Sequence, residues 1–247
     1  MNIYAFLITT IAGLSTLLGS LLIFYKGNKN IIISRSLGFA SGVMLSVSIT
    51  DLVPNSLKLV IEENSGLNSL IMVFFSIFIG ILISMIIKGK IKEKEVSKSN
   101  LYKVGIMAML TIILHNIPEG IATYITTDNN MKLGITLAIA IALHNIPEGI
   151  SISVPIYYST NKKGKAILYT FISGISEIFG AIIAYIFLSK IINNNIIGIL
   201  YGLIAGIMIN ISLNELLPEA KNLNKKNCYM FFIIGFIFMI INHLLFN

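Results

Sequence analysis

The sequence predicts an all-α, polytopic membrane protein with eight transmembrane helices. Only 12% of its 247 residues are charged and 55% are hydrophobic, whereas about 25% of the residues in a typical soluble domain are charged. The apolar residues form uncharged runs of about 20 residues, the length that an α-helix needs to cross a bilayer. Short polar segments separate these runs. These features favour a single transmembrane domain over residues 1–247.

The first three expected helices are bounded by charged segments or by proline. Residues 3–25 carry no charge and lack the basic start of a signal peptide, so the first helix is expected here. The second is expected over residues 34–55 and should end near Pro54, because proline disrupts a helix interior. The third covers the uncharged residues 67–87, and the lysine-rich segment 88–103 that follows is expected to be a loop.

Turn-forming residues separate the remaining helices. Residues 128–130 (Asp-Asn-Asn), 161–165 and 193–195 (Asn-Asn-Asn) are polar breaks, and Pro218 is expected to mark the end of the seventh helix. The helices between these breaks are expected over residues 104–127, 133–158, 166–188, 196–217 and 228–246.

Lysine and arginine are concentrated in alternate loops. Of the 18 basic residues, 15 lie in the loops after the first, third, fifth and seventh helices. Because cytoplasmic loops are rich in these residues, we expect segment 88–103 to be cytoplasmic and both termini to lie outside. The net charge of +7 then follows from topology, and no nucleic-acid partner is expected. We expect the protein in the inner membrane of a bacterial cell, with the lipid bilayer as its surroundings.

One segment occurs twice in the middle of long apolar runs. Residues 114–121 read Leu-His-Asn-Ile-Pro-Glu-Gly-Ile, and residues 143–150 repeat the same eight letters. His115 and Glu119 are four residues apart, as are His144 and Glu148, so each pair should share one helix face. An imidazole and a carboxylate presented twice at similar depth are the ligand types that bind a divalent metal ion.

Three carboxylates are expected near the middle of the membrane. Glu119, Glu148 and Glu177 each lie near the centre of an expected helix, with no lysine or arginine at that depth. Buried carboxylates without a basic partner must be protonated or bind cations. The histidines beside them favour a metal such as zinc, iron or manganese.

Further donors flank these groups. Asn116 and Asn145 add amide oxygens beside each histidine, so a second ion could bind next to the first with Glu177 as another ligand. Pro118 and Pro147 each free the backbone carbonyl four residues earlier. The thioether of Met44 is a candidate soft ligand.

Each of these residues also has a structural interpretation. The doubled motif could be a helix-packing segment with buried hydrogen bonds, Glu177 a protonated acid bonded to a neighbouring helix, and Met44 a filler of the apolar core. Asp51 and Glu215 are expected to be interfacial charges, with a role as gate residues as the alternative. His243 is expected to be an interfacial histidine.

A second, weaker repeat relates the second and seventh helices. Residues 42–54 and 206–218 share Gly, Met, Ser, an acidic residue and Pro at matching positions. The expected topology orients these two segments in opposite directions. We therefore predict an inverted repeat that relates the first three helices to the last three, around the central fourth and fifth. Inverted repeats are common in transporters that bind their substrate near the membrane midplane.

These motifs carry a resemblance to a known family. The doubled His-Asn-Ile-Pro-Glu-Gly segment, the Ile-Ser-Gly-Ile-Ser-Glu stretch that ends at Glu177, and the Gly-x-Met segments at Met44 and Met208 make the sequence similar to the ZIP family of divalent metal transporters. Within that family, the sequence most closely resembles the bacterial ZupT-type zinc transporters. The resemblance extends over all eight expected helices.

The resemblance implies a site for two metal ions. The family pattern places one ion between the two His/Glu pairs, which are His115, Glu119, His144 and Glu148, with Met44 nearby. It places the second ion between Asn116, Asn145, Glu177 and the same two glutamates, which then bridge both ions. Many members carry a histidine-rich loop between the third and fourth helices. Segment 88–103 has no histidine, so metal buffering by this loop is not expected here.

The sequence thus predicts a secondary transporter that takes up divalent cations, preferably Zn²⁺ and also Fe²⁺ or Mn²⁺, into the cytoplasm. The metal is the transported substrate, no cofactor is expected, and the protein is not expected to be an enzyme. A homodimer is compatible with the sequence. An intramembrane metal-dependent hydrolase is the main alternative, although the sequence lacks a His-Glu-x-x-His motif. A proton-translocating or sensor protein without metal is a third interpretation.

Overall fold

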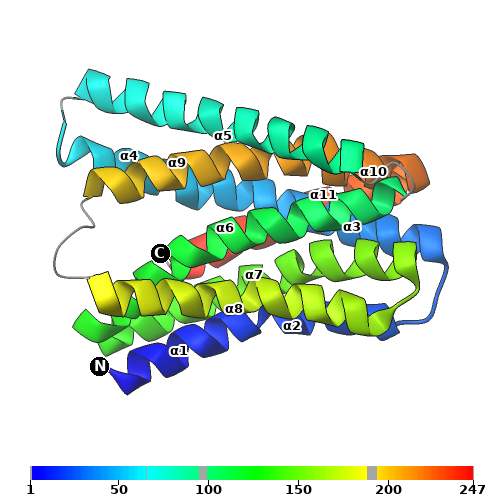
Figure 1. The fold of residues 1–247 in the computed structure, drawn as a ribbon, viewed down its shortest axis with the longest axis horizontal. Helices are drawn as coiled ribbons and strands as arrows, with labels where there is room; N and C mark the ends of the chain where they lie inside the picture. Colours follow the sequence, from blue (N-terminus) through cyan, green and yellow to red (C-terminus); the bar gives the residue numbers. More distant parts are fainter. Residues whose placement is uncertain (1, 65, 95–98, 188–193, 247) are drawn as a thin grey trace.

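The structure is a computed structural model that describes residues 2–64, 66–94, 99–187 and 194–246. Within these ranges, eight helical segments are long and apolar enough to cross a membrane, which confirms the expected number. The segments are Ile3–Phe24, Lys29–Ile61, Gly66–Lys90, Asn100–Asn129, Met131–Thr160, Lys163–Phe187, Asn194–Leu223 and Lys225–Phe246. All regular structure in the described ranges is helical (Figure 1).

The first span is interrupted near its middle. It consists of α1 (Ile3–Leu14), the short α2 (Thr16–Gly19) and the 3₁₀-helix η1 (Ser20–Phe24). At the break, the Ser15 hydroxyl lies 2.6 Å from the carbonyl oxygen of Ala12 and 3.1 Å from that of Ala142, on another span. The break is therefore tied to the neighbouring helix that carries the second copy of the repeated motif.

The second and seventh spans each contain a π-helical turn. In the second, α3 (Lys29–Val47) leads through η2 (Ser48–Leu52) into α4 (Val53–Ile61). In the seventh, α9 (Asn194–Ile211) leads through η3 (Ser212–Leu216) into α10 (Leu217–Leu223). The two turns lie at matching positions of the weaker repeat.

The expected helix ends at Pro54 and Pro218 are wrong. A proline inside a regular α-helix clashes with the carbonyl four residues earlier. Just before Pro54, the N–H of Val53 instead bonds the carbonyl of Ser48, five residues back. The N–H of Leu217 bonds Ser212 in the same way before Pro218. The wider π turn accommodates each proline, so both helices continue.

The two segments that share this turn run in opposite directions through the molecule (Figure 1). Similar sequence has therefore produced the same local backbone in two antiparallel spans. The relation of all three N-terminal helices to the three C-terminal ones remains a prediction.

The other spans are longer than their apolar cores. They are α5 (Gly66–Lys94), α6 (Asn100–Asn129), α7 (Met131–Thr160), α8 (Lys163–Phe187) and α11 (Lys225–Phe246). Much of the expected loop 88–103 is helical, because α5 continues to Lys94 and α6 begins at Asn100. Lysine and glutamate are good helix formers, so charge alone does not end a helix. Residues 95–98 lie outside the described residues.

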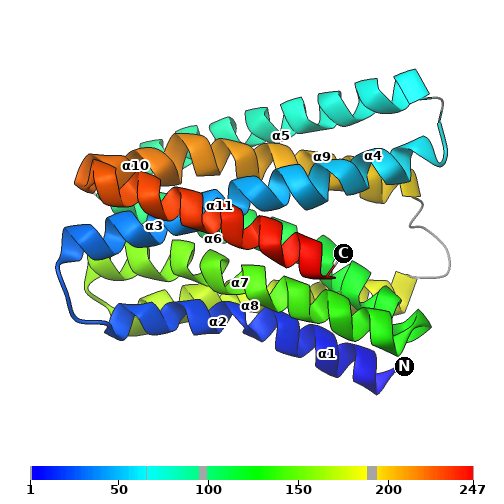
Figure 2. The same ribbon diagram turned by 180° about the vertical axis from the view of Figure 1, so that it is seen from behind.

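The helices form two groups. One contains the first span with α6, α7 and α8, and the other contains α3, α4, α5, α9, α10 and α11 (Figures 1 and 2). The groups meet where α7 packs on α3 and where α6 packs on α9. Both termini lie at the same end of the molecule (Figure 1), as an even number of spans requires.

The glycine of each repeated motif allows two helix backbones to approach closely. A Cβ atom on Gly120 of α6 would collide with the carbonyl oxygen of Glu177 on α8. A Cβ atom on Gly149 of α7 would collide with the carbonyl oxygen of Thr16 on α2. Each glycine directly follows a glutamate of the motif, so these close contacts set where the carboxylates lie.

We expect Gly120→Ala to destabilise the protein by about 1–3 kcal/mol, the usual cost of overpacking a close contact. Thermal unfolding of the purified protein in detergent measures the effect. Gly164→Ala is the matched control, because nothing lies within 4 Å of a Cβ atom built there. Equal unfolding temperatures for the two variants would contradict the proposed packing role of Gly120.

Candidate metal centre

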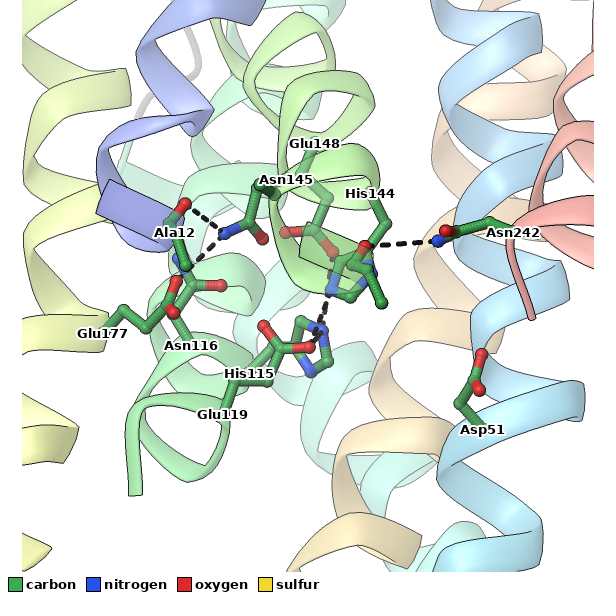
Figure 3. A network of polar contacts seen from close by, with 12 residues as sticks. Ala12, Asp51, His115, Asn116, Glu119, His144, Asn145, Glu148, Glu177 and Asn242 are labelled. Carbon is green, nitrogen blue, oxygen red and sulfur yellow. Dashed lines mark hydrogen bonds and ion pairs between the residues drawn. The ribbon is translucent and has the colours of Figure 1, made fainter. Parts of the chain in front are cut away.

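The two copies of the repeated motif meet between α6 and α7. Both helices stay helical through Pro118 and Pro147, and they present their histidines and glutamates to each other (Figure 3). Glu119 Oε1 lies 3.1 Å from His115 Nε2 on its own helix and 2.8 Å from His144 Nε2 on the neighbouring helix. One carboxylate therefore joins both imidazoles.

Glu148 completes this first group. Its Oε1 lies 3.6 Å from His115 Nε2, and the two imidazole rings are 6.1 Å apart, centroid to centroid. One ligand atom each from His115, Glu119 and His144 lies within 4.8 Å of the others. Zinc takes nitrogen and oxygen ligands at about 2.0–2.2 Å, so two ligands of one tetrahedral ion lie roughly 3.3 Å apart. The separations in this group match that spacing.

A second group lies beside the first and involves both asparagines. Asn145 Nδ2 donates to the carbonyl oxygen of Ala12 at 3.0 Å and to Glu177 Oε2 at 2.9 Å (Figure 3). Asn116 Nδ2 donates to the carbonyl oxygen of Ser173 at 3.0 Å. The Nδ2 group of each asparagine is therefore hydrogen-bonded to another part of the protein. These bonds fix the orientation of the amide and of its oxygen.

The site has a surplus of buried acceptor oxygens. In the described part of the chain, six oxygens here have no hydrogen-bond partner: Asn116 Oδ1, Asn145 Oδ1, Glu119 Oε2, Glu177 Oε1 and both carboxylate oxygens of Glu148. Leaving a buried acceptor unsatisfied costs about 1–3 kcal/mol, and more if it is charged. These amide and carboxylate oxygens come from three helices, α6, α7 and α8, and all of them could be satisfied by binding cations.

Met44 lies in an apolar environment. It is fully buried on α3 in a hydrophobic cluster that also contains Val47, Met107 and Met208. This placement fits the interpretation of Met44 as core. Its role as a soft metal ligand remains a prediction.

The two acidic residues of the weaker repeat both have basic partners. Asp51 Oδ1 on η2 lies 2.6 Å from His243 Nδ1 on α11, and Glu215 on η3 forms an ion pair with Lys88 on α5. Glu215 is 8% exposed and is therefore buried within the protein, and its interfacial position remains a prediction. The sequence does not predict these two pairs, because the partners are far apart along the chain.

Sequence reasoning also missed Asn242. This asparagine on α11 is 4% exposed and donates from Nδ2 to the carbonyl oxygen of Ala140 on α7, at 3.2 Å (Figure 3). It links the two helix groups one helical turn before His144. The one feature of the sequence that could have pointed to Asn242 is that a polar asparagine occurs within an apolar span.

Comparison with known proteins decides the family. Residues 88–243 match the family model described as "ZIP Zinc transporter". The chain belongs to the ZIP family. The matched region of this ZIP protein contains α6, α7, α8 and α9, and it includes all the expected metal ligands except Met44.

Similar proteins cover nearly the whole chain. The zinc transporter ZupT of Streptococcus mutans is 39% identical over 259 residues, which cover 98% of this chain and 97% of that protein. The zinc transporter ZupT of Oceanobacillus iheyensis is 40% identical over 249 residues, covering 94% and 93%. That of Clostridium perfringens is 38% identical over 273 residues, covering 98% and 95%. The resemblance stated from the motifs is therefore confirmed.

We expect the wild-type protein to bind two Zn²⁺ ions tightly and Glu177→Gln or Asn116→Ala to bind one. The first group of ligands stays intact in both variants, whereas the second loses a charge or an oxygen. Equilibrium dialysis of the purified protein against ⁶⁵Zn²⁺ counts the ions.

Asn210→Ala is the control for this measurement. Asn210 is also a buried asparagine, but its Nδ2 donates to Ser84 Oγ at 2.9 Å, away from the site. The second ion position is refuted if Glu177→Gln and Asn116→Ala both keep two tight ions.

Proposed function

We propose that this ZIP protein takes up divalent metal cations, preferably Zn²⁺, into the cytoplasm through a site for two ions near the membrane midplane. The observation that carries the proposal is the set of six unpartnered oxygens beside His115 and His144. The two proposed cations would supply the partners that these oxygens lack. The names of the relatives, all zinc transporters, support zinc as the substrate.

The two ions would share the glutamates. The first is held by His115, Glu119, His144 and Glu148, with Met44 as a further ligand. The second is held by Asn116, Asn145 and Glu177, with Glu119 and Glu148 bridging. Each glutamate has two oxygens, and the unpartnered ones are available to the second ion. An ion can then move by exchanging one bridging oxygen at a time.

The ligand types also bear on selectivity. Imidazole and carboxylate together suit Zn²⁺, Fe²⁺ and Mn²⁺, whereas Mg²⁺ and Ca²⁺ prefer oxygen alone. We therefore propose Fe²⁺ and Mn²⁺ as secondary substrates. The metal is cargo in this mechanism, and no separate cofactor is required.

An intramembrane hydrolase is a weaker alternative. It would have to place a peptide or lipid next to a metal-bound water. The cavity that reaches Glu119 and His144 has a volume of about 90 Å³, which suits an ion with a few waters better than such a substrate. We therefore propose that the protein is not an enzyme.

The proposed location is the inner membrane of a bacterial cell, with both termini outside. The basic loops then lie in the cytoplasm. The lipid bilayer covers exposed apolar side chains such as Phe74 and Phe78 of α5 and Ile234 of α11. A homodimer remains a prediction.

Uptake of ⁶⁵Zn²⁺ into proteoliposomes tests the proposed function. We expect Glu119→Ala and Glu148→Ala each to abolish uptake, because each removes a ligand of both ions. Both variants should remain folded, because the close packing of α6 on α8 at Gly120 and of α7 on α2 at Gly149 does not use these carboxylates. Glu63→Ala, an exposed carboxylate, is the control and should transport normally. Wild-type uptake in either glutamate variant would contradict the bridging mechanism.

Cysteine labelling tests the orientation. Cys228 is the one cysteine of the chain, so Cys228→Ser gives a cysteine-free background. In intact cells, a cysteine in place of Asn130 should react with a membrane-impermeant maleimide, and one in place of Lys163 should react only after lysis. The reverse pattern would place the termini in the cytoplasm.

A further inference from the structure

A cavity extends from the metal centre toward the end of the molecule that carries both termini. Its volume is about 90 Å³, and residues of both helix groups line it. Glu119 and His144 of the metal centre lie on one side, and Asp51 and His243 lie on the other. A water molecule needs about 10–15 Å³ of such a volume, so the cavity can hold a partly hydrated ion.

Asp51 and His243 form a close pair at this cavity. They are 192 residues apart in sequence, yet Asp51 Oδ1 lies 2.6 Å from His243 Nδ1. Their side chains are 22% and 33% exposed, whereas those of Glu119 and His144 are 10% and 8% exposed. An ion that enters from this side therefore meets Asp51 and His243 before the metal centre.

Asn242 supplies a further oxygen along the cavity. Its Nδ2 is bonded to the carbonyl oxygen of Ala140, and its Oδ1 is buried with no hydrogen-bond partner. In Figure 3, Asn242 lies across from His144, with Asp51 farther along the same side. The residue also lines the cavity. An acceptor oxygen without a donor thus belongs to a residue that lines the cavity between the outer pair and the metal centre.

We propose that Asp51 and His243 form an outer binding position for a divalent cation, with Asn242 Oδ1 as the next oxygen on the way to the metal centre. The two ligands of a tetrahedral zinc ion lie roughly 3.3 Å apart, so the outer pair must separate by less than about 1 Å to admit an ion. The other coordination positions are filled by water. The direction of ion movement rests on the proposed function, whereas binding at this position does not.

The outer position would divide dehydration of the ion into two steps. An ion loses some of its water to Asp51 and His243, and loses the rest at the metal centre, where more protein ligands are available. Because the outer position has fewer protein ligands, it binds more weakly, and the ion moves inward. Losing this position should therefore raise the KM of uptake and leave the maximal rate nearly unchanged.

Metal binding to the purified full-length protein tests the position directly. In the Glu119→Ala/Glu148→Ala background, equilibrium dialysis with ⁶⁵Zn²⁺ should show one remaining weak ion. Adding Asp51→Asn or His243→Gln should remove it. If that background is unstable, the wild type should show two tight ions and one weak ion, and Asp51→Asn only the two tight ones. Persistence of the weak ion in both outer variants, or its absence from the parent protein, would overturn the proposal.

Uptake kinetics supply a second measurement. Loss of a supporting group alone costs a metal site about 10- to 100-fold in affinity, so Asp51→Asn and His243→Gln should raise KM about tenfold or more. Asp128→Asn is the matched control, because Asp128 is an exposed carboxylate at the same end and lines no part of the cavity. A normal KM in both outer variants would refute a role of the outer position in uptake, while leaving the proposed transport function intact. Absence of wild-type uptake would refute the transport function, and the binding measurement would still decide the outer position.

Discussion

Glu119 accepts contacts from two histidines on two helices, and this shared carboxylate requires α6 and α7 to lie side by side at a defined depth. His115 approaches it to 3.1 Å and His144 to 2.8 Å. Other features of the fold serve the same requirement. Gly120 and Gly149 let α8 and α2 approach the motif helices closely, and the bonds of Asn145 to Glu177 and Ala12 join the second group of ligands to the first. The proposed divalent ions would complete this arrangement, because six oxygens of the site are acceptors without a hydrogen-bond donor among the described residues.

Each of the two π turns carries an acidic residue that pairs with a basic residue of another span. Asp51 on η2 contacts His243, and Glu215 on η3 contacts Lys88. Both acids lie on matched segments that run in opposite directions, and both pair with a residue from another span. A π turn changes the direction in which the next side chains point. The same local sequence has therefore placed an acid–base pair in two different surroundings, one beside the cavity of the metal centre and one against α5.

Hydropathy predicted the number of spans correctly but made several of them too short, as in α5, which was expected to end at residue 87 and continues to Lys94. Apolar runs stop at lysines, whereas helices continue through them, because a long lysine side chain can keep its charge in water while its stem packs on apolar surface. The prediction of helix ends at Pro54 and Pro218 failed for another reason. A proline breaks an α-helix if the turn before it is a regular α-helical turn. In both segments the turn before the proline is a π turn, so the helix continues. No periodicity in the sequence distinguishes the two cases.

The sequence by itself determined the chemistry of this protein: which ligand types occur, that they occur twice, and that they lie in apolar helices where a charge needs a partner. Those properties are local, since a spacing of four residues fixes a shared helix face. Tertiary structure decided which ligand meets which. His144 contacts Glu119 of the other helix, and Asp51 meets His243 from the far end of the chain. Such pairings depend on how helices cross and how closely their backbones approach, and a single sequence does not contain those quantities in any local pattern.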